Sequence, residues 1–409
     1  MATKNKKSKS QQLSLLKYVL QPGKEVARDN LAGILAAAPQ PKWHGMAMIP
    51  PGSILDAVCV QWHTGSDIPL EIPFYSTMMM IAARMLCARA KIKWQEQDIF
   101  PDPWIVVLAP SGSAKSWTWK KISDCLPSDD SVGIRSLAEP ASGRGLIDGL
   151  MDIGGKGIWR RDEFGQWLKW LDTTQGTEIK DYMLRVYDNQ SLVRRVKEQT
   201  IEVNAPALVC YGTSVDETIG NCLTAESLLD GFAQRYQWVI ARRDDDRNGR
   251  DYPLYKVDTE LIKRRGRELW NVPIHDIYHV TDGAIQAYCR GWRNAWETEV
   301  PYSFYRRNMW MSFKWAMIYH IVLRDESNYI SSEDMQWALR LVREKMGDTL
   351  QLLSLMGQSD LQKMVSKARK IQAKVKEKGQ SWCPSRLIQG IKSIRSLSEA
   401  NLLFKFVST

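Results

Sequence analysis

Four apolar residues stand together without interruption at residues 105–108. Such a run predicts a strand that is buried on both faces. A loop of small residues follows at 109–116, and residues 117–122 then predict a helix. A strand, a short loop and a helix in this order are typical of α/β packing.

Strands and helices are predicted to alternate from residue 104 as far as residue 243. We predict a strand that ends at the acidic pair 162–163, a strand pair at 192–197 and 200–203, an apolar strand at 207–214 and a last strand directly after residue 235. This alternation predicts a mostly parallel sheet covered by helices on both faces, and therefore an α/β fold.

The rest of the sequence is mainly helical in pattern. Residues 26–96 are broken by prolines but contain one long apolar-rich segment, which predicts a helix at 73–93. After an Asp- and Arg-rich loop at 244–251, the chain is predicted to be helical through 323, with one helix at 303–323. We divide the sequence into a basic tail (1–25), an N-terminal helical region (26–98), an α/β core (99–245), a helical lid (246–330) and a basic C-terminal module (331–409).

The C-terminal module combines an apolar helical stripe with basic residues between its members. Helices are predicted to follow at 384–394 and 397–407, and three helices in this order indicate a helix-turn-helix or winged-helix-like DNA-binding module. A basic helical bundle that closes the lid is the alternative. The stripe comprises Leu361, Val365, Ala368, Ile371 and Val375, and the candidate DNA contacts are Lys367, Lys370 and Lys374.

Composition restricts the class of protein. A chain of 409 residues with 44% hydrophobic content can build a large core. No apolar run approaches the roughly 20 residues that span a bilayer, and no secretory signal is recognisable, so we expect no membrane partner. The seven cysteines form no Cys-x-x-Cys pair, which indicates a reducing cytoplasm and no zinc site. His275 and His279 lie in a predicted strand or loop and are not expected to bind metal.

Charge is concentrated at the two ends of the sequence. The formal net charge is +10, with seven Lys or Arg against one acid in 1–28 and eleven against two in 361–409. Segregated positive charge indicates a polyanionic partner, and nucleic acid is the partner that we expect. For the N-terminal lysines, a purely solubilising role is an equal alternative.

The loop at 109–116 carries the candidate chemistry. In a phosphate-binding loop, backbone N–H groups and a helix N-terminus point at one anionic group. Lys115 would reach the outer phosphates and Ser116 would hold Mg²⁺. Alanine stands at positions 109 and 114, where glycine is usual, so an ordinary strand-to-helix turn is the alternative. The candidate nucleotide-binding residues are Pro110, Ser111, Gly112, Ser113, Ala114, Lys115 and Ser116.

A phosphate-binding loop needs one carboxylate for the metal and another for the attacking water. Asp162 is the candidate metal ligand and Glu163 the candidate base. Arg160 and Arg161 stand before them, where a central strand would carry apolar residues. Either this strand is exposed on one side, or the arginines reach a phosphate or a neighbouring subunit. An exposed charge cluster on a turn is the alternative for the acidic pair.

Two polar groups follow later in the sequence. Thr213 and Ser214 end an apolar strand and are candidates to hydrogen-bond the attacking water or the γ-phosphate, with a simple strand-ending turn as the alternative. Arg235 precedes the last strand and has the right charge to stabilise a transferred phosphoryl group. If Arg235 projects from a subunit edge, it would act on a neighbour's nucleotide; a surface salt bridge is the alternative.

In this order the motifs resemble those of the P-loop helicase-like ATPases of phages, plasmids and other mobile elements. These are similar to the AAA+ core of superfamily 3 and MCM-type replicative helicases. The resemblance covers about residues 72–342 and rests on residues 109–116, 162–165, 210–214 and 231–236. It implies an AAA+-like P-loop core that uses ATP and Mg²⁺.

The resemblance also implies a role for each motif. Lys115 and Ser116 look like the Walker A pair, Asp162 and Glu163 like Walker B, Thr213 or Ser214 like sensor 1, and Arg235 like an arginine finger. The strand pair would be a hairpin that grips DNA in a pore, and the lid would supply a second sensor. The hairpin candidates are Arg194, Arg195 and Lys197, and the second-sensor candidates are Arg306 and Arg307.

We therefore expect an ATP-dependent DNA helicase or translocase of a mobile element, in the cytoplasm of a prokaryotic host. It would form a ring, expected to be a hexamer, on single-stranded or forked DNA, with a primase or initiator as a further candidate partner. The first alternative is a DNA-bound AAA+ regulatory ATPase of transposition, partition or helicase loading that does not unwind DNA. The second is a non-catalytic DNA-binding scaffold with a decayed P-loop.

Overall fold

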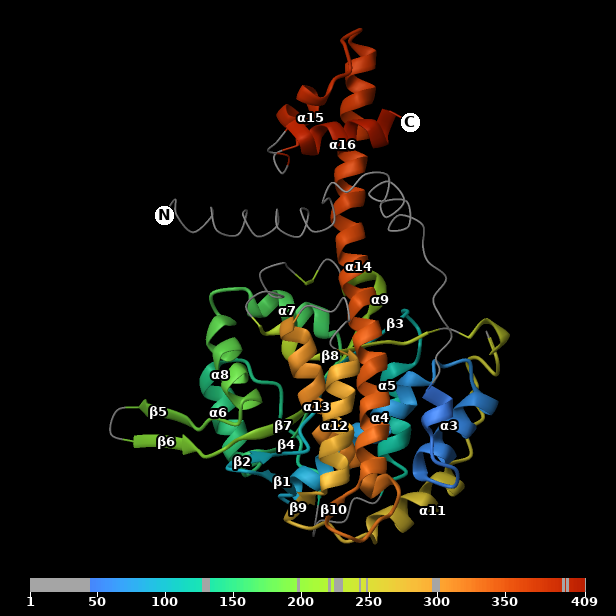
Figure 1. Cartoon of the computed structure of the whole chain (residues 1–409), viewed down its shortest axis with the longest axis vertical. Helices are drawn as coiled ribbons and strands as arrows, with labels where there is room; N and C mark the ends of the chain where they lie inside the picture. The colour runs from blue at the N-terminus through green and yellow to red at the C-terminus, as the bar shows by residue number, and fades with distance from the viewer. Residues whose placement is uncertain are drawn as a thin grey trace. The chain divides into compact units, whose positions relative to one another are not determined.

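Figure 1 shows the computed structural model of the chain, which describes residues 45–126, 133–196, 199–219, 222–223, 231–242, 244–247, 249–295, 302–391, 394 and 397–408. The chain divides into two compact units. The larger unit is Pro41–Leu350, and the smaller one includes Gln351–Thr409. The division falls inside a long helix, later in the sequence than the predicted start of the C-terminal module at residue 331.

A parallel sheet forms the centre of the larger unit. Its strands follow the order β4-β7-β3-β8, and each neighbouring pair is parallel. Every residue of β3 is buried, as the uninterrupted apolar run predicts for a strand covered on both faces. The predicted α/β class with parallel strands is therefore confirmed. The strands are β3 (Trp104–Ala109), β4 (Lys156–Arg161), β7 (Ala207–Val215) and β8 (Gln237–Ile240).

Helices from two parts of the sequence pack around this sheet. α4 precedes the sheet in sequence, is buried along its whole length and contacts β4 and β7. α5 follows β3 directly after the small-residue loop, which confirms the helix predicted at 117–122. Later helices connect the remaining strands. These helices are α4 (Glu71–Cys87), α5 (Lys115–Ser123), α6 (Gly143–Asp152), α7 (Phe164–Leu171), α8 (Thr177–Tyr187) and α9 (Asp216–Ile219).

The sequence pattern does not predict a second sheet, which has the order β10-β9-β1-β2. The helix predicted at 73–93 is wrong beyond Cys87, because Arg89 adopts a positive φ of 66° and the chain turns into β1. β1 buries Ile92 and pairs in parallel with β9, which interrupts the region predicted to be helical through 323. The strands are β1 (Lys91–Trp94), β2 (Gln97–Ile99), β9 (Ile277–Val280) and β10 (Tyr329–Ile330).

The predicted strand pair is an antiparallel hairpin of β5 (Leu192–Val196) and β6 (Gln199–Val203). It is separate from both sheets and lies beside α6 and α8 (Figure 1). Residues 197–198 lie outside the described residues, and with them the candidate Lys197. The strands of the hairpin are confirmed, whereas its role remains a prediction.

Buried polar contacts tie the remaining helices of the larger unit to its core. The Arg84 guanidinium donates hydrogen bonds to the carbonyls of Leu269, Trp270 and Val272, at the end of α11. Lys314 of α13 pairs with Asp102, just before β3, at 2.6 Å. α13 confirms the helix predicted at 303–323. These elements are η1 (Gly45–Met48), α3 (Ile54–Gly65), η3 (Ala233–Arg235), η4 (Asp245–Arg247), α11 (Thr259–Trp270), α12 (Asp282–Ala295) and α13 (Tyr302–Val322).

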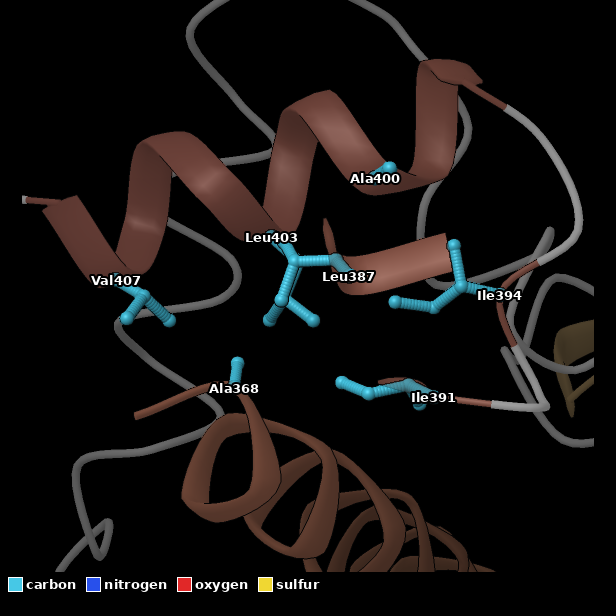
Figure 2. Close-up of a cluster of buried hydrophobic side chains, with 7 residues drawn as sticks. All are labelled: Ala368, Leu387, Ile391, Ile394, Ala400, Leu403 and Val407. Carbon is cyan, nitrogen blue, oxygen red and sulfur yellow. The ribbon is translucent and has the colours of Figure 1, made fainter. Parts of the chain in front are cut away.

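The smaller unit is helical, as its sequence pattern predicts, but the helix predicted at 384–394 ends at Gly390, because Ile391 has an extended backbone. It contains the end of α14 (Ser332–Glu377), α15 (Pro384–Gly390) and α16 (Leu397–Ser408). Gly379 has a φ of 62° just after α14, and Pro384 begins α15. Figure 2 shows the apolar side chains of the three helices and of the segment between α15 and α16 pointing toward one another. No helix in the described part of the chain is both long and apolar enough to cross a membrane.

Candidate functional site

The carboxyl ends of β3, β4 and β7 bring several of the predicted site residues together. Because the three strands are parallel and β7 lies between the other two, the residues at these ends share one edge of the sheet. The Asp162 carboxylate accepts a hydrogen bond from Ser116 at 2.8 Å and one from Thr213 at 2.5 Å. Residues separated by up to 97 positions in sequence thus meet on one carboxylate.

The loop between β3 and α5 is a tight turn whose conformation depends on small residues. Gly112 has a φ of 79° and Ala114 a φ of 50°, and Ser113 bonds back to the carbonyl of Pro110 through both its N–H and its hydroxyl. α5 begins at Lys115 with no side-chain cap. Unpaired N–H groups at a helix start attract anions, so the loop has the backbone geometry of an anion site.

The two alanines that replace glycine in this loop differ in conformation. Ala109 is fully buried in the extended backbone of β3, where it pairs with Val215 and needs no left-handed φ. Ala114 sits in the left-handed region, which costs an L-residue roughly 1–2 kcal/mol. The departure from the usual pattern is therefore sterically neutral at position 109 and strained at position 114.

The Lys115 side chain lies over the same loop. Its ammonium donates to the carbonyls of Ala109 at 3.3 Å and Pro110 at 3.2 Å. Burial lowers the pKa of Lys115, and the nearby carboxylates of Glu163, Asp216 and Asp162 only partly offset this effect. The lysine is thus half-buried and surrounded by acids at the mouth of the loop.

Arg160 adds a cation to the Asp162 carboxylate. Its guanidinium lies 2.5 Å from Asp162 and 5.5 Å from the centre of the Trp119 ring. Burial alone would raise the pKa of Asp162, but the hydrogen bonds from Thr213 and Ser116, together with Arg160, hold it below its ordinary value. Arg161 instead pairs with Glu139. The two arginines on β4 therefore both bind carboxylates of their own chain.

Glu163 and Ser214 have different positions at this edge. Glu163 is exposed and precedes α7 with a φ of 51°, a strained conformation for a residue other than glycine. The Ser214 hydroxyl is buried and accepts a hydrogen bond from the Gly165 N–H at 3.3 Å, so it anchors the start of α7. Of the two candidates on β7, only Thr213 bonds to Asp162.

Sequence reasoning missed Asp216, which follows β7 directly. Its negative charge acts on the Lys115 ammonium, which places it at the same edge. The signal was present, since a polar residue directly after the Thr213 strand falls beside the loop in a parallel sheet. Among the described residues, no group of three or more His, Cys, Asp or Glu could hold a metal ion.

The candidate arginines lie at the opposite edge of the sheet. Arg235 precedes β8, and its guanidinium donates to the Gly231 carbonyl at 3.0 Å and to Asp188 at 2.7 Å. Arg307 hydrogen-bonds Gln234 in the same cluster, and burial followed by the charge of Arg235 lowers its pKa. Arg306 is exposed. Because β3 and β8 are parallel, the structure does not bring Arg235 or Arg307 to the Lys115 of the same chain.

The candidate DNA contacts lie in two places. Arg194 of β5 pairs with Glu178 at 3.0 Å, and Arg195 is exposed. Lys367, Lys370 and Lys374 are exposed on α14 in the smaller unit. A comparison of the chain with protein-family models and with curated proteins found no match.

Proposed function

We propose that this chain is an ATP hydrolase with an AAA+-like P-loop core, which drives movement along DNA as the helicase-like motor of a mobile element. The observation that carries this proposal is the pair of hydrogen bonds from Ser116 and Thr213 to Asp162, beside Lys115. Hydroxyl, carboxylate and ammonium groups held at one helix N-terminus are what Mg²⁺-nucleotide hydrolysis requires.

The residues at this edge fit Mg²⁺. Ser116 and Asp162 offer hard oxygen ligands 2.8 Å apart, and Mg²⁺ commonly takes one or two protein carboxylates together with substrate phosphates. Ser116 and Asp162 would hold the ion, and Arg160, which lies 2.5 Å from the same Asp162 oxygen, would have to release that oxygen for the ion to bind. When bound, Mg²⁺ would neutralise charge that develops on the phosphates.

The chain's own groups would supply the remaining steps. The Lys115 ammonium would leave the carbonyls of its loop and bind the outer phosphates of the nucleotide. The first N–H groups of α5 would donate hydrogen bonds to the same phosphates. Thr213 would keep Asp162 oriented. Glu163 would take the proton of the attacking water, a role that its exposed position next to the Lys115 loop allows.

The position of Arg235 supports action between subunits. It lies at the amino end of the sheet, away from its own Lys115, so it would reach a phosphate only on a neighbouring chain. A closed ring, expected to be a hexamer, gives every Arg235 such a neighbour. Asp188, 2.7 Å away, holds the guanidinium in place before assembly.

Substitution of Glu163 by Gln tests the proposed chemistry. Removal of a general base reduces turnover by about 10²–10⁴-fold, whereas the phosphate contacts remain. We expect Glu163→Gln to bind ATP as the wild type does and to release phosphate at least about 100-fold more slowly. Loss of ATP binding, or unchanged turnover, would contradict the assigned role. The exposed Glu139→Gln is the control and should change neither quantity.

A strand-displacement assay separates the motor from the alternatives. ATP-dependent unwinding of a forked duplex supports the helicase. DNA-stimulated hydrolysis without unwinding or translocation would instead favour a regulatory ATPase. DNA binding by a wild type that hydrolyses no ATP under any DNA condition would favour a scaffold with a decayed loop.

A further inference from the structure

We infer that the smaller unit binds the phosphate backbone of nucleic acid through one stripe of lysines on α14, without reading bases. The stripe consists of Lys367, Lys370, Lys374 and Lys378. This inference deepens the DNA partner of the proposed function but does not depend on ATP hydrolysis. It assigns the binding to α14 and not to the α15–α16 pair that a helix-turn-helix would use.

The core of the smaller unit determines which side of α14 is exposed. Ala368 and Val375 are buried, and Figure 2 shows Ala368 directed toward Leu387 and Leu403 from the two following helices. Trp382 stacks on Phe404 with ring centres 5.3 Å apart and packs against this core. α15 and α16 cover the apolar side of α14, and the four lysines lie about a quarter turn around the helix from that side, where all of them are exposed.

The four lysines form a straight line on the helix. They are spaced by three, four and four residues, which places them on one face of an α-helix. Lys378 continues the line because its N–H donates to the Lys374 carbonyl at 3.2 Å. At about 1.5 Å of rise per residue, the stripe is roughly 16 Å long. One strand of a duplex carries about five phosphates over that length.

The charge of this unit selects a polyanion. Residues 361–409 contain eleven Lys or Arg and two Glu. Lysine binds a phosphate as a point charge on a flexible stem and does not need the planar geometry of base recognition. A nucleic-acid backbone presents negative charges along a line, and the lysines of the stripe present positive charges along a line. The spacing of the lysines therefore indicates a nucleic-acid backbone as the partner.

Among the described side chains of α16, Asn401 is the one exposed residue of a type that reads base edges. Reading helices present Arg, Lys, Asn or Gln to the major groove. Among the α16 side chains that the structure describes, Ala400, Leu403 and Val407 are buried, and the exposed ones are Leu397 and Asn401. Binding through the lysine stripe alone would be independent of sequence and strongly dependent on salt. Four phosphate contacts correspond to a slope of log affinity against log salt of about −3.6 on duplex DNA.

Two double variants with the same change of charge test the stripe. Lys370→Glu/Lys374→Glu removes two of its members, whereas Arg369→Glu/Lys376→Glu changes two exposed residues on another side of the same helical segment. Binding of the full chain to labelled 30-base-pair duplexes of two unrelated sequences is measured by fluorescence anisotropy without ATP, from 50 to 300 mM NaCl. Circular dichroism melting confirms that both variants are folded.

We expect the stripe variant to bind at least tenfold more weakly and its salt slope to become shallower by about 2. The control variant should keep the wild-type slope, and the two sequences should bind equally within about twofold. Equal losses in the two variants would show that only total charge matters and would overturn the inference. So would a preference above tenfold for one sequence, or binding to vesicles with 30% anionic phospholipid in place of DNA.

The outcome also separates this inference from the proposed function. The stripe variant should retain DNA-independent phosphate release, because no residue of the nucleotide site is changed. If it loses DNA binding and keeps basal turnover, both proposals are supported. If DNA binding is unchanged in the stripe variant while turnover is normal, the inference fails and the hydrolase proposal stands.

Discussion

The two alanines of the loop should respond in opposite directions to the same substitution. Ala114 adopts a φ of 50°, whereas Ala109 is buried in an extended strand. Glycine has no Cβ and adopts the left-handed region without penalty. Ala114→Gly should therefore relieve strain, and Ala109→Gly should only remove a packed methyl group.

The magnitudes follow from these environments. Ala114→Gly relieves about 1–2 kcal/mol of left-handed strain and loses about 0.4–1 kcal/mol because glycine increases the entropy of the unfolded chain. The net result is stabilisation by about 0.5–1 kcal/mol. Ala109→Gly costs about 0.5–1 kcal/mol in strand propensity and about 0.8 kcal/mol for the buried methyl group. The free energies of unfolding of the two variants should thus differ by about 2 kcal/mol.

Urea unfolding of the full chain, followed by tryptophan fluorescence and circular dichroism, measures this difference. We expect the transition midpoint to rise in Ala114→Gly and to fall in Ala109→Gly, with unchanged slopes. Each variant is the matched control of the other, since the atoms removed are identical. A lower midpoint for Ala114→Gly than for Ala109→Gly would refute the assignment of strain to position 114.

Three further predictions concern the subunit contact, a buried ion pair and a buried acid. A mixture of Arg235→Ala and Glu163→Gln chains should regain phosphate release that neither variant has alone. The Arg235→Ala chain supplies an intact Glu163 site, and a neighbouring Glu163→Gln chain supplies the arginine. No gain over the separate variants would exclude action between subunits. Lys314→Met should lower the free energy of unfolding by about 3–5 kcal/mol, because it leaves the Asp102 carboxylate buried without its cation. The double variant Lys314→Met/Asp102→Asn should lose much less stability. Equal losses for the two variants in thermal melts would contradict this explanation. Burial raises the pKa of Glu71 from 4.5 to about 7 despite its contacts with Arg242, so the folded state binds more protons than the unfolded state between these two pH values. Stability relative to Glu71→Gln should therefore fall, by at most about 3 kcal/mol, as the pH rises from about 4.5 to 7; a rise over this window in urea titrations would show that the acid is stabilised in its charged form.

Local patterns in the sequence were enough to predict the sheet edge that carries the candidate site. The apolar run of β3 predicts a buried strand, and the small residues after it predict a tight turn into a helix. The order of the later motifs predicted that Asp162 would lie near Ser116, and the two side chains are hydrogen-bonded. Thr213 and Ser214 are neighbours with equivalent hydroxyl groups, so the sequence does not show which of them contacts Asp162. Their alternating positions on β7 give them different partners. Thr213 bonds to Asp162 and Ser214 to the start of α7.

The second sheet could not be predicted in the same way. β1 pairs with β9 across more than 180 residues of sequence, and neither strand is long enough to stand out from its helical neighbours. A continuous helical pattern at 73–93 conceals the change at Arg89, because a left-handed residue other than glycine leaves no local signal. The ion pairs of Arg161 and Arg235 likewise depend on partners that only the tertiary fold brings near.

Phosphate release from ATP with Mg²⁺ and forked DNA, compared between the wild type, Lys115→Ala and Lys120→Ala, tests the central proposal most directly. Lys120 is an exposed lysine on the same helix and controls for the loss of charge from α5. The account predicts turnover by the wild type and by Lys120→Ala, and a loss of at least about 100-fold in Lys115→Ala, because the Lys115 ammonium lies over the loop. Equal turnover in all three proteins, or none in the wild type, would contradict it.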